Sequence, residues 1–199
     1  KADPFLAHLR PLFAKANKIE ILAAFVQNSG VERLRAPLLA AIERGAFVRI
    51  LTGDYLHITQ ARALRSLLDL QSGEALTDDD EDSTEPKAAG GLRVRVVESQ
   101  RLRPEASTFH PKSWIFMGAG VGAAFVGSSN LSWAALSDGL EWNLRVDERR
   151  DPVAFRKVVD SFEETWTRGT ELTQTWLDGY GDRAAAVQRD LPGWDVEAD

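Results

Sequence analysis

The 199-residue chain contains no cysteine, which excludes a disulfide framework, a thiolate nucleophile and any zinc site built on cysteine. It has no apolar run that could span a bilayer, because the longest, at residues 19–26, has only the length of a strand. No segment has the pattern of a secretory signal peptide. We therefore predict a cytoplasmic protein with no membrane partner. The chain begins with lysine instead of methionine, and we expect it to be a fragment of a longer protein.

Basic residues are also in short supply, with 24 Lys and Arg against 30 Asp and Glu and a formal net charge of −6. An acidic balance argues against nucleic acid as a partner, because phosphates repel acidic surfaces. However, seven of the acids lie in residues 74–85, which contain no basic residue and no hydrophobic periodicity. The rest of the chain has 24 basic and 23 acidic residues, so its charge does not exclude DNA. We interpret residues 74–91 as a mobile acidic surface loop.

Hydrophobic periodicity predicts alternating helices and strands up to residue 71, then a run of strands and one long helix. The expected helices are residues 4–16, 31–44, 59–71 and 152–167. The expected strands are residues 18–26, 46–52, 92–98, 109–117, 122–126 and 140–146. Asp151 is placed to cap the long helix, whereas Pro11 is expected to kink or split the first one. This order predicts an α/β sandwich with a mixed sheet.

The domain is predicted to occupy residues 1–170. Residues 171–199 are expected to add short peripheral helices, at 172–176 and 183–189, and an acidic tail from residue 190. No internal repeat is found, so any motif in the chain occurs once.

Two segments carry residues suited to phosphate chemistry. His110 and Lys112 are two residues apart on a predicted strand, so their side chains project from the same face. Residues 127–130 (Gly-Ser-Ser-Asn) end the next strand, where small residues let a ligand approach the backbone and polar ones donate hydrogen bonds. Glu141 follows Asn130 by 11 residues, a separation that allows the strand ends to converge.

Such a group fits an anionic ligand. Lys112 supplies charge, Asn130 and a serine supply neutral donors, and His110 can act as nucleophile or proton carrier near neutral pH. Glu141 is placed to accept the other imidazole N–H and hold its tautomer. Each piece alone has an ordinary explanation: an incidental pair on a strand, a turn, or a carboxylate in a salt bridge. Together they favour a phosphodiester-cleaving site, provided that a second acid is supplied.

Residues 110–112 (His-Pro-Lys) followed by residues 127–130 resemble the HxK…GSxN signature of the phospholipase D-like, or HKD, superfamily. The likeness covers roughly residues 1–165. It is greatest to the N-terminal phospholipase D-like domain of bacterial superfamily 2 helicases and to HKD nucleases and restriction endonucleases. One position departs from the full motif, because Met117 stands where the family has an aspartate. In nuclease-like branches a later glutamate serves instead, and Glu141 stands at that place.

The resemblance implies an α/β/α sandwich whose mixed, largely parallel central sheet is flanked by helices. It also implies metal-independent cleavage without a cofactor, in which His110 attacks phosphorus and a second histidine protonates the leaving oxygen. Lys112, Asn130, Ser128 and Ser129 hold the phosphate, and Glu141 orients His110. Family members have two copies of the motif or form dimers, so the single copy here implies a homodimer through the active-site face. A helicase region covalently linked beyond this fragment is a further implied partner.

DNA is the expected substrate. Candidate contacts outside the motif are a cluster of arginines and one tryptophan beside the serine loop: Arg93, Arg95, Arg101, Arg103 and Trp133. Asp54 and Tyr55, after the second strand, are candidates for lining the same edge of the sheet. Two other functions remain open. One is a DNA-docking or dimerisation module without turnover. The other is a transferase of phospholipid-type phosphodiesters, against which stand Met117 and the lack of an interfacial apolar segment.

Overall fold

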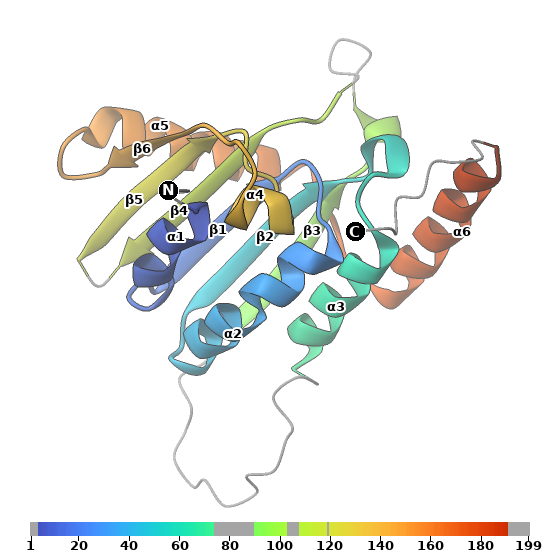
Figure 1. Ribbon diagram of the computed structural model, residues 1–199, viewed down its shortest axis with the longest axis horizontal. Coiled ribbons are helices and arrows are strands. Elements are labelled where there is room, and N and C mark those ends of the chain that lie inside the picture. The colour runs from blue at the N-terminus through green and yellow to red at the C-terminus, as the bar shows by residue number, and fades with distance from the viewer. Residues whose placement is uncertain (1–3, 74–89, 103–107, 119, 191–199) are drawn as a thin grey trace, which may run out of the picture.

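A computed structural model describes residues 4–73, 90–102, 108–118 and 120–190. Within this part, seven strands form one sheet in the order β6-β5-β4-β1-β2-β3-β7 (Figure 1). The strands are β1 (Lys18–Ala23), β2 (Phe47–Gly53), β3 (Gly91–Val97), β4 (Lys112–Gly118), β5 (Val121–Gly127), β6 (Asn143–Asp147) and β7 (Thr170–Glu171). Most of the predicted acidic loop, Arg103 and the end of the acidic tail lie outside the described residues.

The mixed sheet is confirmed, but the prediction that it is largely parallel is wrong. Among the six neighbouring pairs of described strands, only β1–β2 and β2–β3 are parallel. The pairs β1–β4, β4–β5, β5–β6 and β3–β7 are antiparallel. For β4 and β5 the reason is the length of the connection. A parallel crossover needs about a dozen residues, whereas only residues 119 and 120 separate β4 from β5.

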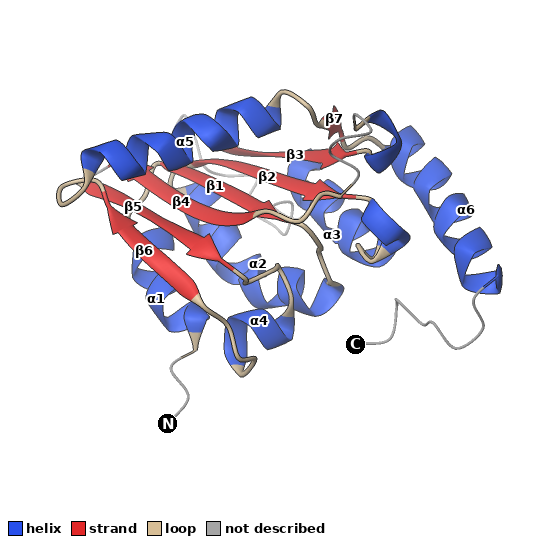
Figure 2. Ribbon diagram, turned by 90° about the horizontal axis from the view of Figure 1, so that it is seen from above, coloured by secondary structure: helices blue, strands red, loops and turns tan. Residues whose placement is uncertain are grey.

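Helices cover both faces of the sheet, as expected for an α/β/α sandwich (Figure 2). One face carries α1 (Phe5–Phe13), α2 (Asn28–Glu43), α3 (Ala61–Ser72) and the short α4 (Trp133–Ser137). The other face carries α5 (Pro152–Trp166). Each face has its own buried cluster of apolar side chains, the larger one beneath α1, α2 and α3. The sheet is therefore buried from both sides, which explains the nearly continuous apolar sequence of β1 and β2.

Several local predictions are corrected by the structure. Helix α1 runs through Pro11 without splitting. One helix, α6 (Gln174–Asp190), stands where two short helices were expected, and its Tyr180 is buried in the larger cluster against α3. The sequence did not predict α4, which Ser132 caps by accepting a hydrogen bond from the N–H of Ala135. The capping role of Asp151 at α5 is confirmed, since its side chain accepts from the N–H of Ala154.

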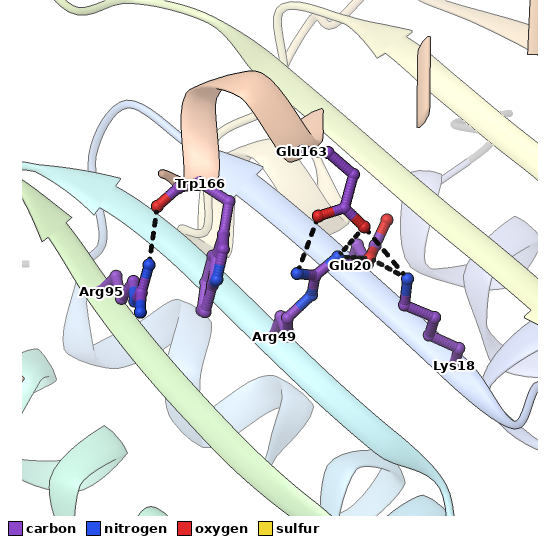
Figure 3. A network of polar contacts seen from close by, with 6 residues as sticks. All are labelled: Lys18, Glu20, Arg49, Arg95, Glu163 and Trp166. Carbon is purple, nitrogen blue, oxygen red and sulfur yellow. Dashed lines mark hydrogen bonds and ion pairs between the residues drawn. The ribbon is translucent and has the colours of Figure 1, made fainter. Parts of the chain in front are cut away.

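A network of charges joins α5 to the sheet (Figure 3). Arg49 of β2 donates hydrogen bonds to Glu20 of β1 and to Glu163 of α5, and Lys18 pairs with both carboxylates. The hydrogen bond from Arg49 is the main cause that holds the pKa of Glu163 below its ordinary value. Glu20 is completely buried, so its charge depends on these partners. The network fixes α5 over the strands at the end opposite to the motif residues.

The segments that carry the motifs lie at the end of the sheet opposite to this charge network. Because β1, β2 and β3 are parallel, their carboxyl ends meet there, and Lys112 at the start of β4 pairs with Ala23 at the end of β1. Gly53 at the end of β2 lies against Phe109, so closely that a Cβ atom would be only 2.5 Å from the ring. Residues near 54, 110 and 130 therefore approach one another although they are distant in sequence.

Among the helices of the described segments, none is long and apolar enough to cross a membrane.

Candidate active site

His110 and Lys112 form the centre of the site. Lys112 is the first residue of β4, whereas His110 precedes the strand instead of lying within it. The two side chains nevertheless meet as expected, with Lys112 Nζ 2.7 Å from His110 Nδ1. The ammonium also donates to the carbonyl oxygen of His110 at 2.9 Å. Lys112 is 6% exposed and His110 is exposed, so a fixed charge lies directly behind an accessible imidazole.

Phe25, which the sequence analysis missed, supports both residues. Its ring packs edge-on against the imidazole of His110, with 5.3 Å between the ring centroids. Lys112 Nζ lies 5.8 Å from the centre of the same ring, within the range of a cation–π contact. Phe25 follows β1 at the carboxyl edge of the sheet. This position after a buried strand is the feature of the sequence that could have identified Phe25 as a site residue. Its ring limits how far the imidazole can turn.

Asn130 is oriented by the backbone of the same segment. The N–H of Phe25 donates to Asn130 Oδ1 at 3.1 Å, which fixes the side-chain oxygen toward β1. The amide nitrogen Nδ2 forms no hydrogen bond within the described residues, so it is available as a donor to a ligand. Asn130 is half-buried and bonds to the backbone of Phe25, the residue whose ring contacts the imidazole of His110.

The two serines before Asn130 have different environments. Ser128 is exposed and its hydroxyl donates to Glu141. Ser129 is completely buried: its hydroxyl accepts from Asn143 Nδ2 at 2.8 Å and its carbonyl accepts from Trp114 Nε1. A buried hydroxyl cannot contact a phosphate that arrives from solvent, so Ser129 holds the loop and only Ser128 is open to a ligand.

Glu141 is held beside Ser128 by a reciprocal pair of contacts. Ser128 donates to the carboxylate, and the N–H of Trp142 donates to the Ser128 hydroxyl at 3.0 Å. The expected hydrogen bond from His110 to Glu141 is not formed between these described residues. Glu141 is close enough to Lys112 to raise the pKa of the ammonium, which opposes the larger effect of burial. The carboxylate therefore balances the charge of the lysine and contacts Ser128 instead of the histidine.

The electrostatic surroundings favour a neutral imidazole. Partial burial and, second to it, the charge of Lys112 lower the pKa of His110 below its ordinary value of 6.5. Because an attacking nitrogen must be unprotonated, the lowered pKa keeps His110 competent as a nucleophile at neutral pH and somewhat below.

This shift predicts the pH dependence of the site. As pH falls, protonation of His110 removes the nucleophile, and the acid limb of kcat/KM is expected below pH 6.5. Replacing Lys112 with glutamine removes one of the two causes, so the pKa of the imidazole should rise toward its ordinary value. NMR titration of the His110 ring in both proteins measures this. An unchanged pKa in Lys112→Gln would contradict the electrostatic account.

The other candidate contacts are not brought together. Arg95 donates to the carbonyl of Trp166 at 3.1 Å and caps the carboxyl end of α5 (Figure 3). Arg101 pairs with Glu98, and Arg93 lies over Phe47 of β2. Arg103 lies outside the described residues. Arg93 and Arg95 thus lie on β3 and Arg101 follows it, and β1 and β2 separate β3 from β4.

The structure also describes the surroundings of two further candidates from the sequence. Asp54 accepts from the N–H of Ser99 at 2.7 Å, so it ties the ends of β2 and β3 together. Trp133 begins α4, three residues after Asn130, and is 43% exposed. Across the segments that the structure describes, no three His, Asp or Glu side chains gather in a way that would hold a metal ion.

Residues 11–166 match the family model described as cardiolipin synthase, PLD-like domain. The chain belongs to the phospholipase D-like family. The match includes the histidine–lysine segment, the loop at 127–130 and Glu141, so the resemblance seen in the sequence is confirmed. No curated protein sequence is similar enough to count as a match.

Solved structures show the same fold at low sequence identity. A phospholipase D family member, Nuc from Salmonella typhimurium, superposes with a TM-score of 0.57 at 16% identity, over 83% of this chain and 88% of that one. NucT from Helicobacter pylori gives 0.54 at 14% identity, over 83% and 89%. Phosphatidylserine synthase from Haemophilus influenzae Rd KW20 gives 0.53 at 14%, over 92% of this chain and 42% of that one. The phospholipase D-like fold therefore spans nearly the whole described chain.

Proposed function

We propose that the chain is a phosphodiesterase module of the nuclease type, which cleaves DNA without a metal through a phosphohistidine. The observation that carries the proposal is the contact of Lys112 with His110, at 2.7 Å, beside an Asn130 amide whose nitrogen has no other partner among the described residues. His110 and Lys112 from one segment, and Asn130 from another, would then offer a nucleophile, a positive charge and a neutral donor to one phosphate. This is the set that phosphoryl transfer requires.

The reaction follows from these positions in two steps. A ring nitrogen of His110 attacks phosphorus and the bond to the leaving oxygen breaks, which gives a phosphohistidine. Lys112, Asn130 and Ser128 hold the phosphoryl oxygens while charge develops on them. A second histidine gives a proton to the leaving oxygen, then takes one from the water that attacks the phosphohistidine. Hydrolysis releases a phosphomonoester and restores His110.

The second histidine is proposed to come from another copy of the chain. Neither of the two remaining histidines repeats the motif: His8 on α1 lines a surface pocket together with Glu141, and His57 packs against Tyr180 of α6 at 5.4 Å. A homodimer through the active-site face would bring two copies of His110 to one phosphate.

A strip of exposed apolar side chains supports this partner. Trp142 is 81% exposed and Leu144 70%. Leu144 of β6 pairs with Val126 of β5, and Trp142 directly precedes β6, at the end of the sheet nearest the site. With Glu141 they line a surface hollow of about 520 Å³. Large apolar side chains beside polar site residues are typical of protein interfaces. Strand β6 is also an edge of the sheet in the described structure, with one side open to pairing.

The proposal also covers the bounds of the domain and the protein that contains it. We place the catalytic domain in residues 1–170, within a longer cytoplasmic protein whose further region includes a helicase. Because Arg95 and Arg101 already bond to groups within the domain, this module alone is expected to bind DNA weakly. The linked region would supply the remaining affinity.

The proposal predicts cleavage of end-labelled DNA in the presence of EDTA, because no step uses a metal. Gel analysis of the products measures it. Activity per protomer is expected to fall on dilution, since one active site needs two chains. A strict requirement for added magnesium would contradict the mechanism. So would an activity per protomer that stays constant when the protein is diluted to a monomer.

A docking module without turnover is separated by a trapping experiment. Rapid acid-free quenching with labelled DNA is expected to leave label covalently bound to His110, detectable by mass spectrometry of the peptide. DNA binding without this adduct, and without cleavage, would favour docking.

A further inference from the structure

We propose that Trp133 and Arg33 form a platform on which an unpaired nucleobase stacks next to the phosphate held at His110. The inference rests on the proposed function, in that it takes a nucleic acid as the substrate, and it goes further by selecting single-stranded DNA or unpaired ends over an intact duplex.

The guanidinium group of Arg33 lies over the ring of Trp133. The guanidinium carbon of Arg33, on α2, lies 4.3 Å from the centre of the Trp133 ring, so the charge covers one face of the indole. Trp133 still exposes 43% of its surface. An aromatic ring that is open to solvent on one side and backed by a cation can stack a base, while the arginine attracts the phosphate beside it.

The platform is rigidly joined to the active site. The N–H of Trp133 donates to Ser29 Oγ at 3.2 Å, at the start of α2. The N–H of Gln27 donates to the carbonyl of Leu131 at 2.9 Å, and that of Leu131 to the carbonyl of Phe25 at 3.3 Å.

Gly30 of α2 packs against the same carbonyl of Leu131 with no room for a Cβ atom. The start of α2 and the segment that carries Asn130 and Trp133 therefore form one unit. Because Phe25 belongs to this unit and touches His110, the distance from platform to nucleophile does not depend on a mobile loop.

The separation fits a neighbouring nucleotide. Three residues of chain join Asn130 to Trp133, which span about 10 Å at most. A base stacked on Trp133 would therefore belong to a nucleotide close to the phosphate that Asn130 binds. In a duplex both faces of each base are already covered by its neighbours, so only an unpaired or displaced base can use the platform.

The test compares two labelled oligomers of equal length and charge, a single-stranded oligothymidylate and an abasic oligomer. Binding is measured by fluorescence anisotropy with the His110→Ala chain, which cannot cleave the probe. The thymidylate is expected to bind about 5- to 150-fold more tightly, which corresponds to about 1–3 kcal/mol of stacking. Trp133→Ala in the same background should remove this preference and leave the affinity for the abasic oligomer unchanged.

Two control variants complete the test. Trp133→Phe keeps an aromatic face and should retain most of the preference. Val153→Ala alters another exposed apolar side chain, on α5, and should change neither affinity. Equal binding of the two oligomers, or a preference that survives Trp133→Ala, would overturn the inference. If the preference depends on Trp133 but the chain with His110 intact does not cleave DNA, the platform is supported and the catalytic proposal is refuted.

Discussion

Replacing His110 with alanine is expected to reduce the rate of phosphodiester cleavage by about 10⁴-fold or more, because it removes the nucleophile outright. The imidazole is exposed and its described contacts are with Phe25 and Lys112, so the substitution should leave the fold and its melting temperature nearly unchanged. Steady-state cleavage of a labelled oligonucleotide in EDTA measures the loss, and the labelled phosphohistidine should vanish with it.

The matched variant is His8→Ala, which removes the exposed imidazole of α1 that lines a pocket with Glu141. Because the second histidine is proposed to come from another copy of the chain, this substitution is expected to leave the rate unchanged. Lys112→Ala should also impair cleavage, although the nucleophile remains, because the developing charge on phosphate loses its cation. A His110→Ala protein that still cleaves DNA, or still forms the covalent adduct, would show that another residue attacks phosphorus.

Replacing Arg49 with alanine is expected to destabilise the domain by about 3–5 kcal/mol, the usual cost of removing one partner of a buried charge pair. Glu20 is completely buried and would keep only Lys18 as a partner, while Glu163 would lose the donor that holds α5 to β2 (Figure 3). Because a domain is stable by only about 5–15 kcal/mol, this is a large share of the total. Urea unfolding followed by circular dichroism measures the change.

Two variants test the cause of that loss. Arg49→Met combined with Glu20→Leu removes both charges and should recover much of the stability, since an apolar pair leaves no buried charge uncompensated. Arg145→Ala breaks a more exposed pair with Asp147 and should cost less than about 1 kcal/mol. If Arg49→Ala were no more harmful than Arg145→Ala, the network would not be what secures α5.

The sequence predicts most of the elements correctly because the apolar face of each is buried. The periodicity of residues 31–44 and 59–71 corresponds to α2 and α3, and the apolar run after Lys18 to β1, because these segments cover or form the core of the sheet. The strand direction is not contained in such patterns. Antiparallel and parallel strands of a buried sheet have the same apolar sequence, so the largely parallel sheet was predicted wrongly.

For the site residues too, some contacts could be predicted from the sequence and others could not. The pairing of His110 with Lys112 follows from local spacing, and the structure places the two side chains in contact. The partners of Glu141 and Ser129 depend on which strands become neighbours. Glu141 contacts Ser128 instead of His110, and Ser129 is buried by Asn143, since β6 pairs with the end of β5. Phe25 carries no motif, and only the folded chain brings its ring against His110.

What could be read from the chain alone is the chemistry on offer: no thiol, one histidine–lysine motif, one serine–asparagine loop and a charge excess confined mainly to residues 74–85. These are properties of residue identity and short-range order, which hold in any conformation. Which groups meet is a property of the tertiary fold. The carboxyl edge of the sheet gathers Phe25, His110 and Asn130 from three separate segments, and a backbone hydrogen bond from Phe25 fixes the oxygen of the asparagine amide. Long-range strand pairing sets those contacts, and no local pattern in the sequence contains them.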